Sequence, residues 1–310
     1  MRRFDLSGRT NEQNSLKIYS FLNDFVFKCV FGQEKNSKLL VCLLNAFLSL
    51  KGNDKIVEVQ IVNPFNEKDF QSEKLCILDI KAVDLTKRRF NIEVQVREFD
   101  AYIDRATYYL AKLYSSQLQA GEDYTALCKA TGISILDFEV FPEFKTARSV
   151  YRLMDSENSH VLEDTIELHF IELPKLAEKL KNKPQTPFEK WLHLLKFGEN
   201  YFNNEENIPI DLAEEEGIKL TINQFCLVNS NEHFRAAIEA REKAIRDEAT
   251  RLKTAVENAF KNGEEKGFKN GEEKTKIETA KNLLSMGVSI EIASEATGLS
   301  IEEIRNFSIK

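Results

Sequence analysis

Long apolar runs are missing from this 310-residue sequence. No segment approaches the ~20 consecutive apolar residues that a bilayer-spanning helix needs. The N-terminal segment MRRFDLSGRTNEQNS also lacks the apolar stretch of a signal peptide. We therefore expect a soluble, cytoplasmic protein with no membrane partner.

Metal-binding patterns of cysteine and histidine are missing as well. The five cysteines are scattered and form neither a CxxC pair nor a disulfide framework. The four histidines show no HExxH or zinc-finger spacing. His169 lies in the alternating run IELHFIEL, which favours a strand residue over a metal ligand. These absences argue against a zinc site.

Positive charge is not in excess. The sequence has 43 Lys and Arg against 50 Asp and Glu, which gives a net charge of -7 and a pI near 5.4. Coating nucleic acid through overall charge needs clustered Lys and Arg, so the charge balance argues against that class of protein. An enzyme can still bind DNA in a local basic groove. Composition therefore neither supports nor excludes DNA as a partner.

Strand and helix patterns follow one another in a simple order over residues 16–142, and 42% hydrophobic residues are enough for a substantial core. We expect one sheet with a crossover helix, an α/β core. The expected elements are two helices within 16–50, separated by Gly32 and ended by Gly52, strands over 55–63, 74–85 and 89–99, a helix over 100–121 that stops at Gly121, and a strand over 132–141.

The C-terminal half reads mainly as helix. Two further strand-like runs occupy 148–155 and 165–173, and the pattern is helical from about Pro184. Residues 231–285 are charged and contain KNGEEK twice, with glycines that weaken an isolated helix. The chain ends in two short amphipathic helices joined at Gly298, too small to bury their apolar faces alone. We expect this tail to be either mobile or paired with another chain.

Two acidic residues stand out on the hairpin formed by the second and third expected strands. Side chains alternate along a strand, so Glu93 and Gln95 point away from Phe90 and Ile92. The hairpin would bring Asp79 beside Glu93. Two adjacent carboxylates repel unless a cation lies between them, and Mg²⁺ accepts carboxylate and phosphate oxygens together. The same pattern also fits solvated polar residues on a half-exposed sheet.

The chain resembles the recombination-promoting nuclease family of the PD-(D/E)XK superfamily. The resemblance covers nearly all of residues 22–173 and ends at ELHFIELPKL. It is carried by LNDFVFKCVFG (22–32), ILDIKAVD (77–84), NIEVQV (91–96), RATYYLAKLYSSQLQAGEDY (105–124) and ISILDF (133–138).

This resemblance implies a PD-(D/E)XK restriction-endonuclease-like core with a helical C-terminal extension. The superfamily pattern maps onto Asp79 and Glu93 as catalytic metal ligands and onto Gln95, where the wider superfamily has lysine. Glutamine carries no charge, although its amide can still position water. We expect Lys81, on the face of Asp79, to supply the missing charge. The resemblance implies that Asp24 is an auxiliary metal ligand. The alternative is that Asp24 is an N-cap or first-turn residue of its helix and has no role in metal binding.

The nuclease interpretation also includes several weaker candidates for the active site and for contacts with DNA. Asp84 and Asp104 are weaker acidic candidates. Arg105, Lys112 and Gln117 are expected to face the DNA backbone, whereas Tyr109 falls in the apolar stripe of its helix.

The function implied is a Mg²⁺-dependent DNA endonuclease, with other divalent ions as alternatives, that promotes recombination or acts on mobile or foreign DNA. A PD-(D/E)XK centre implies strand cleavage and not strand transfer. We expect a nuclease domain over 1–175, a helical region over 176–235, and a charged tail over 236–310 that mediates self-association. The alternatives are a catalytically weak DNA-binding or regulatory protein on the same fold, and an interaction protein acting through its tail.

Overall fold

The computed structural model describes residues 17–63, 79–98, 100–176 and 184–308. The N-terminal segment and the first part of the expected strand 74–85 lie outside the described residues. The chain divides into two compact units, residues 1–239 and 240–310. Among the described helices, none combines the length and apolar character that a membrane span requires.

A six-stranded sheet forms the centre of the first unit, with the strand order β1-β2-β3-β4-β8-β5. Strands β3, β4 and β8 are parallel, and the other neighbouring pairs are antiparallel. The strands are β1 (Val59–Ile61), β2 (Ile80–Asp84), β3 (Arg89–Gln95), β4 (Ala130–Leu136), β5 (Arg148–Arg152) and β8 (Ile166–Glu172), and β6 (Met154–Asp155) pairs with β7 (His160–Val161) in a separate small hairpin.

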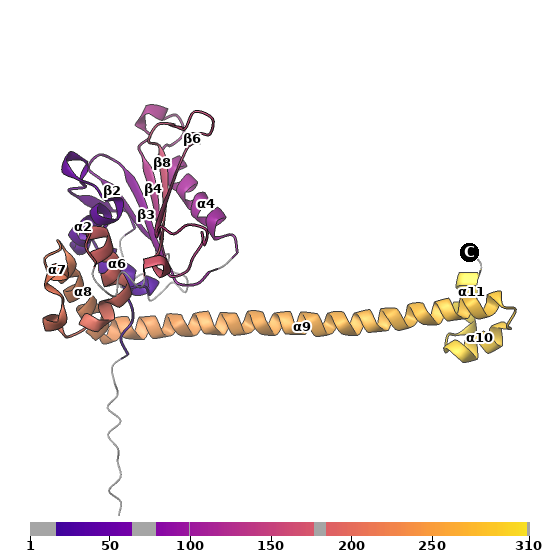
Figure 1. Cartoon of the computed structure of the whole chain (residues 1–310). Coiled ribbons are helices and arrows are strands. Elements are labelled where there is room, and N and C mark those ends of the chain that lie inside the picture. Colours follow the sequence, from indigo (N-terminus) through magenta and orange to yellow (C-terminus); the bar gives the residue numbers. More distant parts are fainter. Residues whose placement is uncertain (1–16, 64–78, 99, 177–183, 309–310) are drawn as a thin grey trace, which may run out of the picture. The chain divides into compact units, whose positions relative to one another are not determined.

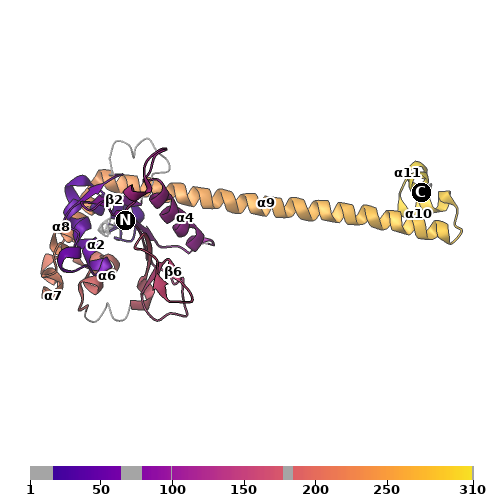
Figure 2. The same ribbon diagram turned by 90° about the horizontal axis from the view of Figure 1, so that it is seen from above.

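Helices cover both faces of this sheet. Figure 1 shows α4 on one side and α2 and α6 on the other, and Figure 2 shows the same layers from above. In the described part of this unit, the α-helices that surround the sheet are α1 (Asp24–Phe31), α2 (Ser37–Leu48), α4 (Tyr102–Ser115), α6 (Pro187–Phe197), α7 (Ile210–Ala213) and α8 (Ile218–Ser230). The 3-10 helices are η1 (Glu34–Asn36), η2 (Gly52–Asp54), η3 (Tyr124–Ala126), η4 (Leu173–Leu176), η5 (Gly198–Tyr201) and η6 (Glu205–Asn207).

Strand alternation assigns the side chains to the two layers. Ile80, Ile92 and Ile133 join the large core that α1, α2, α6 and α8 build. The opposite face carries Phe170, which packs with Leu110 of α4 in a second, smaller core. Because residues opposite one another share a face, the register from Glu93 to Ser134 to Phe170 places Glu93 on the α4 side. The sheet face under α4 is therefore the face that carries the hairpin carboxylates.

The expected order of helices, three strands, helix and strand is confirmed, with shifted boundaries. Gly32 is the C-cap of α1, but α2 ends at Ser49, which adopts the left-handed conformation (φ 56°) three residues before Gly52. Helix α4 ends at Ser115, well before Gly121 (φ 92°), which lies in the following turn. Glycine thus marks the turns in both places without itself ending the helix.

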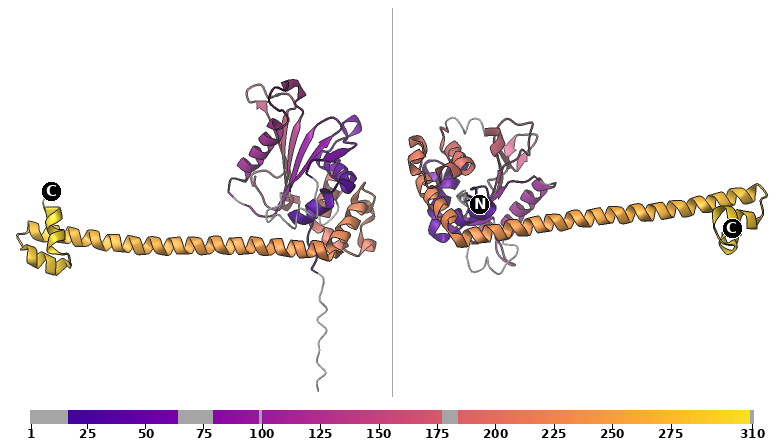
Figure 3. Two further views of the ribbon diagram at one scale, coloured as in Figure 1. Left: turned by 180° about the vertical axis from the view of Figure 1, so that it is seen from behind. Right: turned by 90° about the horizontal axis from the view of Figure 1, so that it is seen from below.

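Among its described residues, the second unit has helices and no strands. The helix α9 (Glu232–Ser285) continues from the first unit and passes through Gly263, Gly267 and Gly271 without a break. α10 (Ile290–Thr297) and α11 (Ile301–Ser308) fold back on its end, where Ala280, Ala293 and Ile304 are buried together. These are the yellow helices of Figure 3. The expected helix junction at Gly298 is present, and Ser300 and Glu303 form a capping pair at the start of α11.

Candidate active site

The hairpin register brings Asp79 and Glu93 together. β2 and β3 pair with Ile80 opposite Ile92 and Lys81 opposite Asn91. Continuing this antiparallel register by one residue places Asp79, which directly precedes β2, opposite Glu93. Residues opposite one another in an antiparallel pair have their side chains on the same face at about 4.5–5.5 Å between Cβ atoms. The two carboxylates are therefore neighbours on the face that α4 covers.

Glu93 is held by three side chains. The Tyr102 hydroxyl donates to Oε1 of Glu93 at 2.6 Å, and the Ser134 hydroxyl donates to the same oxygen at 3.4 Å. Arg105 of α4 places Nη2 3.3 Å from Oε2. Burial, followed by the charge of Glu93, raises the pKa of Tyr102, so its hydroxyl remains a donor. These contacts to both oxygens fix the orientation of the half-buried Glu93 carboxylate.

Gln95 and Glu93 contact the same cation, Arg105. Its Oε1 accepts a hydrogen bond from Nη2 of Arg105 at 3.4 Å, and its Nε2 donates to the carbonyl of Arg97 at 3.2 Å. The positive charge beside the glutamine therefore comes from α4. Sequence analysis assigned Arg105 only to the DNA backbone, because the distance from a helix to a strand cannot be obtained from residue spacing.

One carboxylate oxygen of Asp79 contacts a cation, and the other accepts no hydrogen bond among the described residues. Oδ2 lies 3.8 Å from Nζ of Lys81, a side chain that is 38% exposed. Oδ1 is buried and accepts no hydrogen bond within the described part of the chain. A buried, unpaired carboxylate oxygen is costly and indicates a missing partner such as an ion or water. This oxygen, with Glu93 opposite, fits the oxygen-rich donor set of Mg²⁺.

A buried lysine fixes the backbone at Asp79. Nζ of Lys28, on α1, donates to the Asp79 carbonyl at 2.6 Å and to the Asn63 carbonyl at 2.7 Å. Asn63 in turn accepts from the backbone N–H of Lys81 at 2.7 Å and donates to the Asp79 carbonyl at 3.0 Å. Sequence analysis missed this role. The signal was a lysine between Phe27 and Cys29 in a helix whose other residues after Asp24 are all apolar.

Asp24 lies at the start of that same helix. Asn23 is the N-cap, and its side chain accepts from the N–H groups of Phe25 and Val26. Asp24 accepts from the N–H of Phe25 at 2.8 Å, one turn before Lys28. This local contact fits a first-turn residue, which stabilises the positive end of a helix. Asp24 is also one turn from the lysine that anchors Asp79, so it remains a proposed auxiliary ligand.

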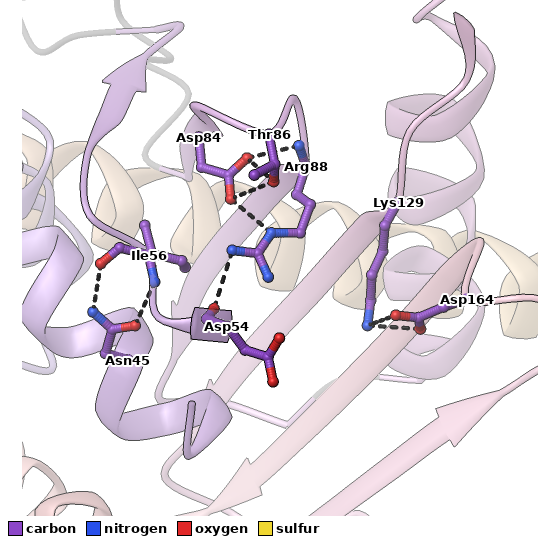
Figure 4. Close-up of polar contacts among 8 residues, drawn as sticks. All are labelled: Asn45, Asp54, Ile56, Asp84, Thr86, Arg88, Lys129 and Asp164. Carbon is purple, nitrogen blue, oxygen red and sulfur yellow. Dashed lines mark hydrogen bonds and ion pairs between the residues drawn. The ribbon is translucent and has the colours of Figure 1, made fainter. Parts of the chain in front are cut away.

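Asp84 belongs to the hairpin turn at the far end of β2. Its carboxylate, 3% exposed, accepts from the Thr86 hydroxyl at 2.8 Å and from the backbone N–H and Nε of Arg88 at 2.8 and 2.6 Å. Figure 4 shows these contacts together with the Arg88 bond to the carbonyl of Asp54. Every oxygen of Asp84 is used in the turn, so its role is structural.

The structure also alters the expectations for two weaker candidates, Gln117 and Tyr109. The Gln117 amide is bonded to the backbone N–H and carbonyl of Cys128, so it joins the segment after α4 to the segment before β4. Tyr109 is 41% exposed and not part of the core. The prediction of a core Tyr109 was wrong, because the apolar stripe of α4 is centred on Ala106, Leu110 and Leu113.

A second charged cluster occupies the opposite sheet face. Glu167 of β8 lies 2.7 Å from Nε2 of His169, 3.0 Å from Arg152, and in contact with Lys129, which also pairs with Asp164 (Figure 4). Burial opposes ionisation of Glu167, but hydrogen bonds from His169, Arg152 and Lys129 outweigh it and hold the pKa of Glu167 well below its ordinary value. His169 is a strand residue, as expected.

A cavity of about 740 Å³ lies away from the hairpin, between α2 and the start of α6. Burial, together with Glu215 and Glu216, raises the pKa of its Cys42 thiol to about 11. The thiol is therefore protonated near neutral pH and is a poor nucleophile. The volume of this cavity alone does not mark it as the candidate site, and the paired carboxylates lie elsewhere, on the hairpin.

Three-ligand metal clusters are absent from the described residues, where no group of three His, Cys, Asp or Glu side chains is close enough to hold an ion. The hairpin offers two carboxylates. This is the usual protein contribution to a Mg²⁺ site that takes its other ligands from water and substrate phosphates.

Comparison with known protein families finds one family model that matches the chain. The pattern of the PD-(D/E)XK nuclease family transposases fits residues 21–255, which include both hairpin strands, α4 and the helices of the first unit. No curated protein and no solved structure matches the chain. Since the match spans well over half of the 310 residues, the chain belongs to the PD-(D/E)XK nuclease family transposases, and its sheet and helices form the α/β core of that fold.

Proposed function

We propose that this protein is a divalent-metal-dependent DNA endonuclease that uses Asp79 and Glu93 to hold Mg²⁺. The observation that supports this most is the pair itself. Asp79 lies opposite Glu93 in register, and its Oδ1 is buried without a hydrogen bond. An ion bound there would supply Lewis-acid polarisation of the phosphodiester and a lower pKa for the attacking water.

The surrounding side chains have separate parts in this proposal. Tyr102 and Ser134 orient Glu93, and Lys28 fixes the backbone of Asp79. The Gln95 amide positions water, because it can donate to and accept from it. A preoriented site of this kind needs little reorganisation during reaction, which is how enzymes stabilise developing charge.

Lys81 and Arg105 are the two candidates for the positive charge that lysine supplies in the wider superfamily. Lys81 is 3.8 Å from Asp79, whereas Arg105 bonds both Glu93 and Gln95. The Arg105 position favours it as the charge beside Gln95. Lys81 remains a candidate for the charge beside Asp79.

Plasmid cleavage tests the proposed function directly. Purified full-length protein is incubated with supercoiled DNA in Mg²⁺, Mn²⁺, Ca²⁺ or EDTA, and nicked and linear products are separated on a gel. We expect cleavage with Mg²⁺ or Mn²⁺ and none with EDTA. DNA binding without cleavage under every ion would instead support the alternative of a non-catalytic DNA-binding protein, which Gln95 and the net charge of -7 make worth testing.

Self-association through the second unit is the other part of the proposal. Ile245, Ala249, Leu252, Val256 and Ala259 follow one another at spacings of four and three residues, which aligns them on one face of α9. All five are exposed, and Val256 is 69% exposed. An apolar seam at this spacing is typical of a helix that pairs with a second copy.

A further inference from the structure

A small basic pocket lies beside the candidate active site, between α4 and strands β1 to β3. It has a volume of about 120 Å³. Its charged and polar lining consists of Lys81 and Arg89 from the sheet and Tyr109, Lys112 and Ser116 from α4. Drug-sized ligands occupy about 300–1,000 Å³, so this pocket has room for a single phosphate group but not for a whole nucleotide.

The pocket is continuous with the paired carboxylates. On the sheet, Lys81 lies two residues after Asp79 on the same face, and Arg89 pairs with Val83 two residues farther along. On the helix, Tyr109, Lys112 and Ser116 follow Arg105 at spacings of four, three and four residues, which is one face of α4. Because Arg105 contacts Glu93, the helix face leads from the site into the pocket.

Two of the three cations of this pocket have no acidic partner among the described residues. Neither Arg89 nor Lys112 has an ion pair within the described part of the chain, and Lys81 has only the 3.8 Å contact with Asp79. Three positive side chains close together repel one another, which favours a bound anion. This contrasts with the net charge of -7 for the whole chain.

We propose that this pocket binds a backbone phosphate of the DNA strand next to the phosphate that is cut, an inference that rests on the proposed nuclease function. Arg89 and Lys112 supply charge-assisted hydrogen bonds to phosphate oxygens. Lys81 lies between the two phosphate positions. Tyr109, which is 41% exposed and has the Arg105 guanidinium 6.0 Å from its ring centre, offers a surface for a base or sugar.

A strand fits this pocket better than a free anion does, for two reasons. The cations continue from Arg105 past Lys81 and Lys112 to Arg89, so a chain of phosphates meets one charge after another. The pocket also opens beside the carboxylates that would act on the neighbouring phosphate. Contacts to phosphate fix the register of the strand without reading its sequence.

The test uses full-length protein and a fluorescein-labelled 30-base-pair duplex. Binding is measured by fluorescence anisotropy in EDTA from 50 to 200 mM NaCl, and cleavage is measured with Mg²⁺. We expect Arg89→Ala and Lys112→Ala each to weaken binding about tenfold at ~0.1 M salt and to reduce the slope of log K against log salt by about one. KM should rise while kcat changes less than about threefold.

Two kinds of control accompany these variants. Lys38→Ala removes an exposed lysine from α2, on the other layer, and should leave affinity and slope unchanged. Lys112→Arg retains the charge and should bind like the wild type.

The outcomes distinguish a failure of the phosphate site from a failure of the proposed nuclease function. If the wild type cleaves DNA but both alanine variants retain its affinity and salt slope, the phosphate site is wrong and the nuclease function stands. A fall in kcat with unchanged KM would also overturn the phosphate site, because it would place these cations in the chemistry. If the wild type neither binds nor cleaves DNA, the proposed function fails and the pocket inference fails with it.

Discussion

Arg105 is hydrogen-bonded to Gln95, with Nη2 of the arginine 3.4 Å from Oε1 of the glutamine. The same nitrogen lies 3.3 Å from Glu93, so one guanidinium joins the carboxylate to the residue that replaces the lysine of the wider superfamily. A guanidinium stays charged at every working pH and has several fixed donors. The loss of lysine at position 95 therefore does not leave this part of the site without positive charge.

The first prediction compares the two cations. Arg105→Ala should lower kcat about 100-fold, because it removes a preoriented cation where negative charge develops. Lys81→Ala should affect mainly KM, since Lys81 is 38% exposed and lines the neighbouring pocket. Initial rates over a range of DNA concentrations separate the two effects. A full wild-type kcat for Arg105→Ala would show that the charge beside Gln95 is not needed.

The second prediction is a rescue by Gln95→Lys. Alone, this change adds an ammonium beside the Arg105 guanidinium, and the two like charges should give no more than wild-type activity. In the Arg105→Ala background the new lysine replaces the lost charge and should recover about tenfold of the rate. A double-mutant cycle on kcat measures this coupling. If the two changes act additively, the residues do not share one role.

The third prediction concerns the Glu167 cluster and pH. Because the folded state depresses the pKa of Glu167, its ionised form stabilises the fold above its ordinary pKa of about 4.5, and this stability is lost as the pH falls below that value. Glu167→Gln should reduce the free energy of unfolding at pH 7 by about 3 kcal/mol, because it removes the buried carboxylate that pairs with Lys129, Arg152 and His169 and leaves Lys129 with Asp164 alone.

Urea denaturation at pH 7 and pH 4 measures this effect. The difference between the variant and the wild type should shrink at the lower pH. The exposed Glu163→Gln is the matched control and should match the wild type at both pH values. A constant difference across this range would mean that the carboxylate charge is not what stabilises the cluster.

Much of the α/β core could be predicted from sequence because its signals are local. Alternation defined the hairpin strands, and a period near 3.6 defined α4. Two features depended on contacts between distant residues and were missed. Lys28 reaches Asp79 across 51 positions, and β8 inserts between β4 and β5. The glycines of α9 were expected to weaken the helix, yet their helix-forming neighbours maintain it through Gly263, Gly267 and Gly271.

The fourth prediction is that the second unit sets the oligomeric state. Truncation after Glu239 should lower the mass by light scattering and keep Mg²⁺-dependent nicking, because the hairpin lies in the first unit. In the full chain, Leu252→Asp with Val256→Asp should have the same effect, since both are exposed on the apolar seam of α9.

Thr254→Asp is the control for these seam variants, because it introduces the same charge on another face of the same helix. It should retain the wild-type mass. An unchanged mass for the truncated protein, together with lost DNA affinity, would instead assign the tail to DNA.

The most direct test of the metal-dependent site is the nicking rate of Asp79→Asn with saturating Mg²⁺. The change keeps the size of the side chain and removes its charge, so folding, followed by thermal melting, should be retained. We predict a loss of about 1,000-fold or more, because a ligand of the proposed ion is removed. Asp247→Asn, at an exposed position of α9, is the matched control and should keep the wild-type rate. Wild-type nicking by Asp79→Asn would contradict the account.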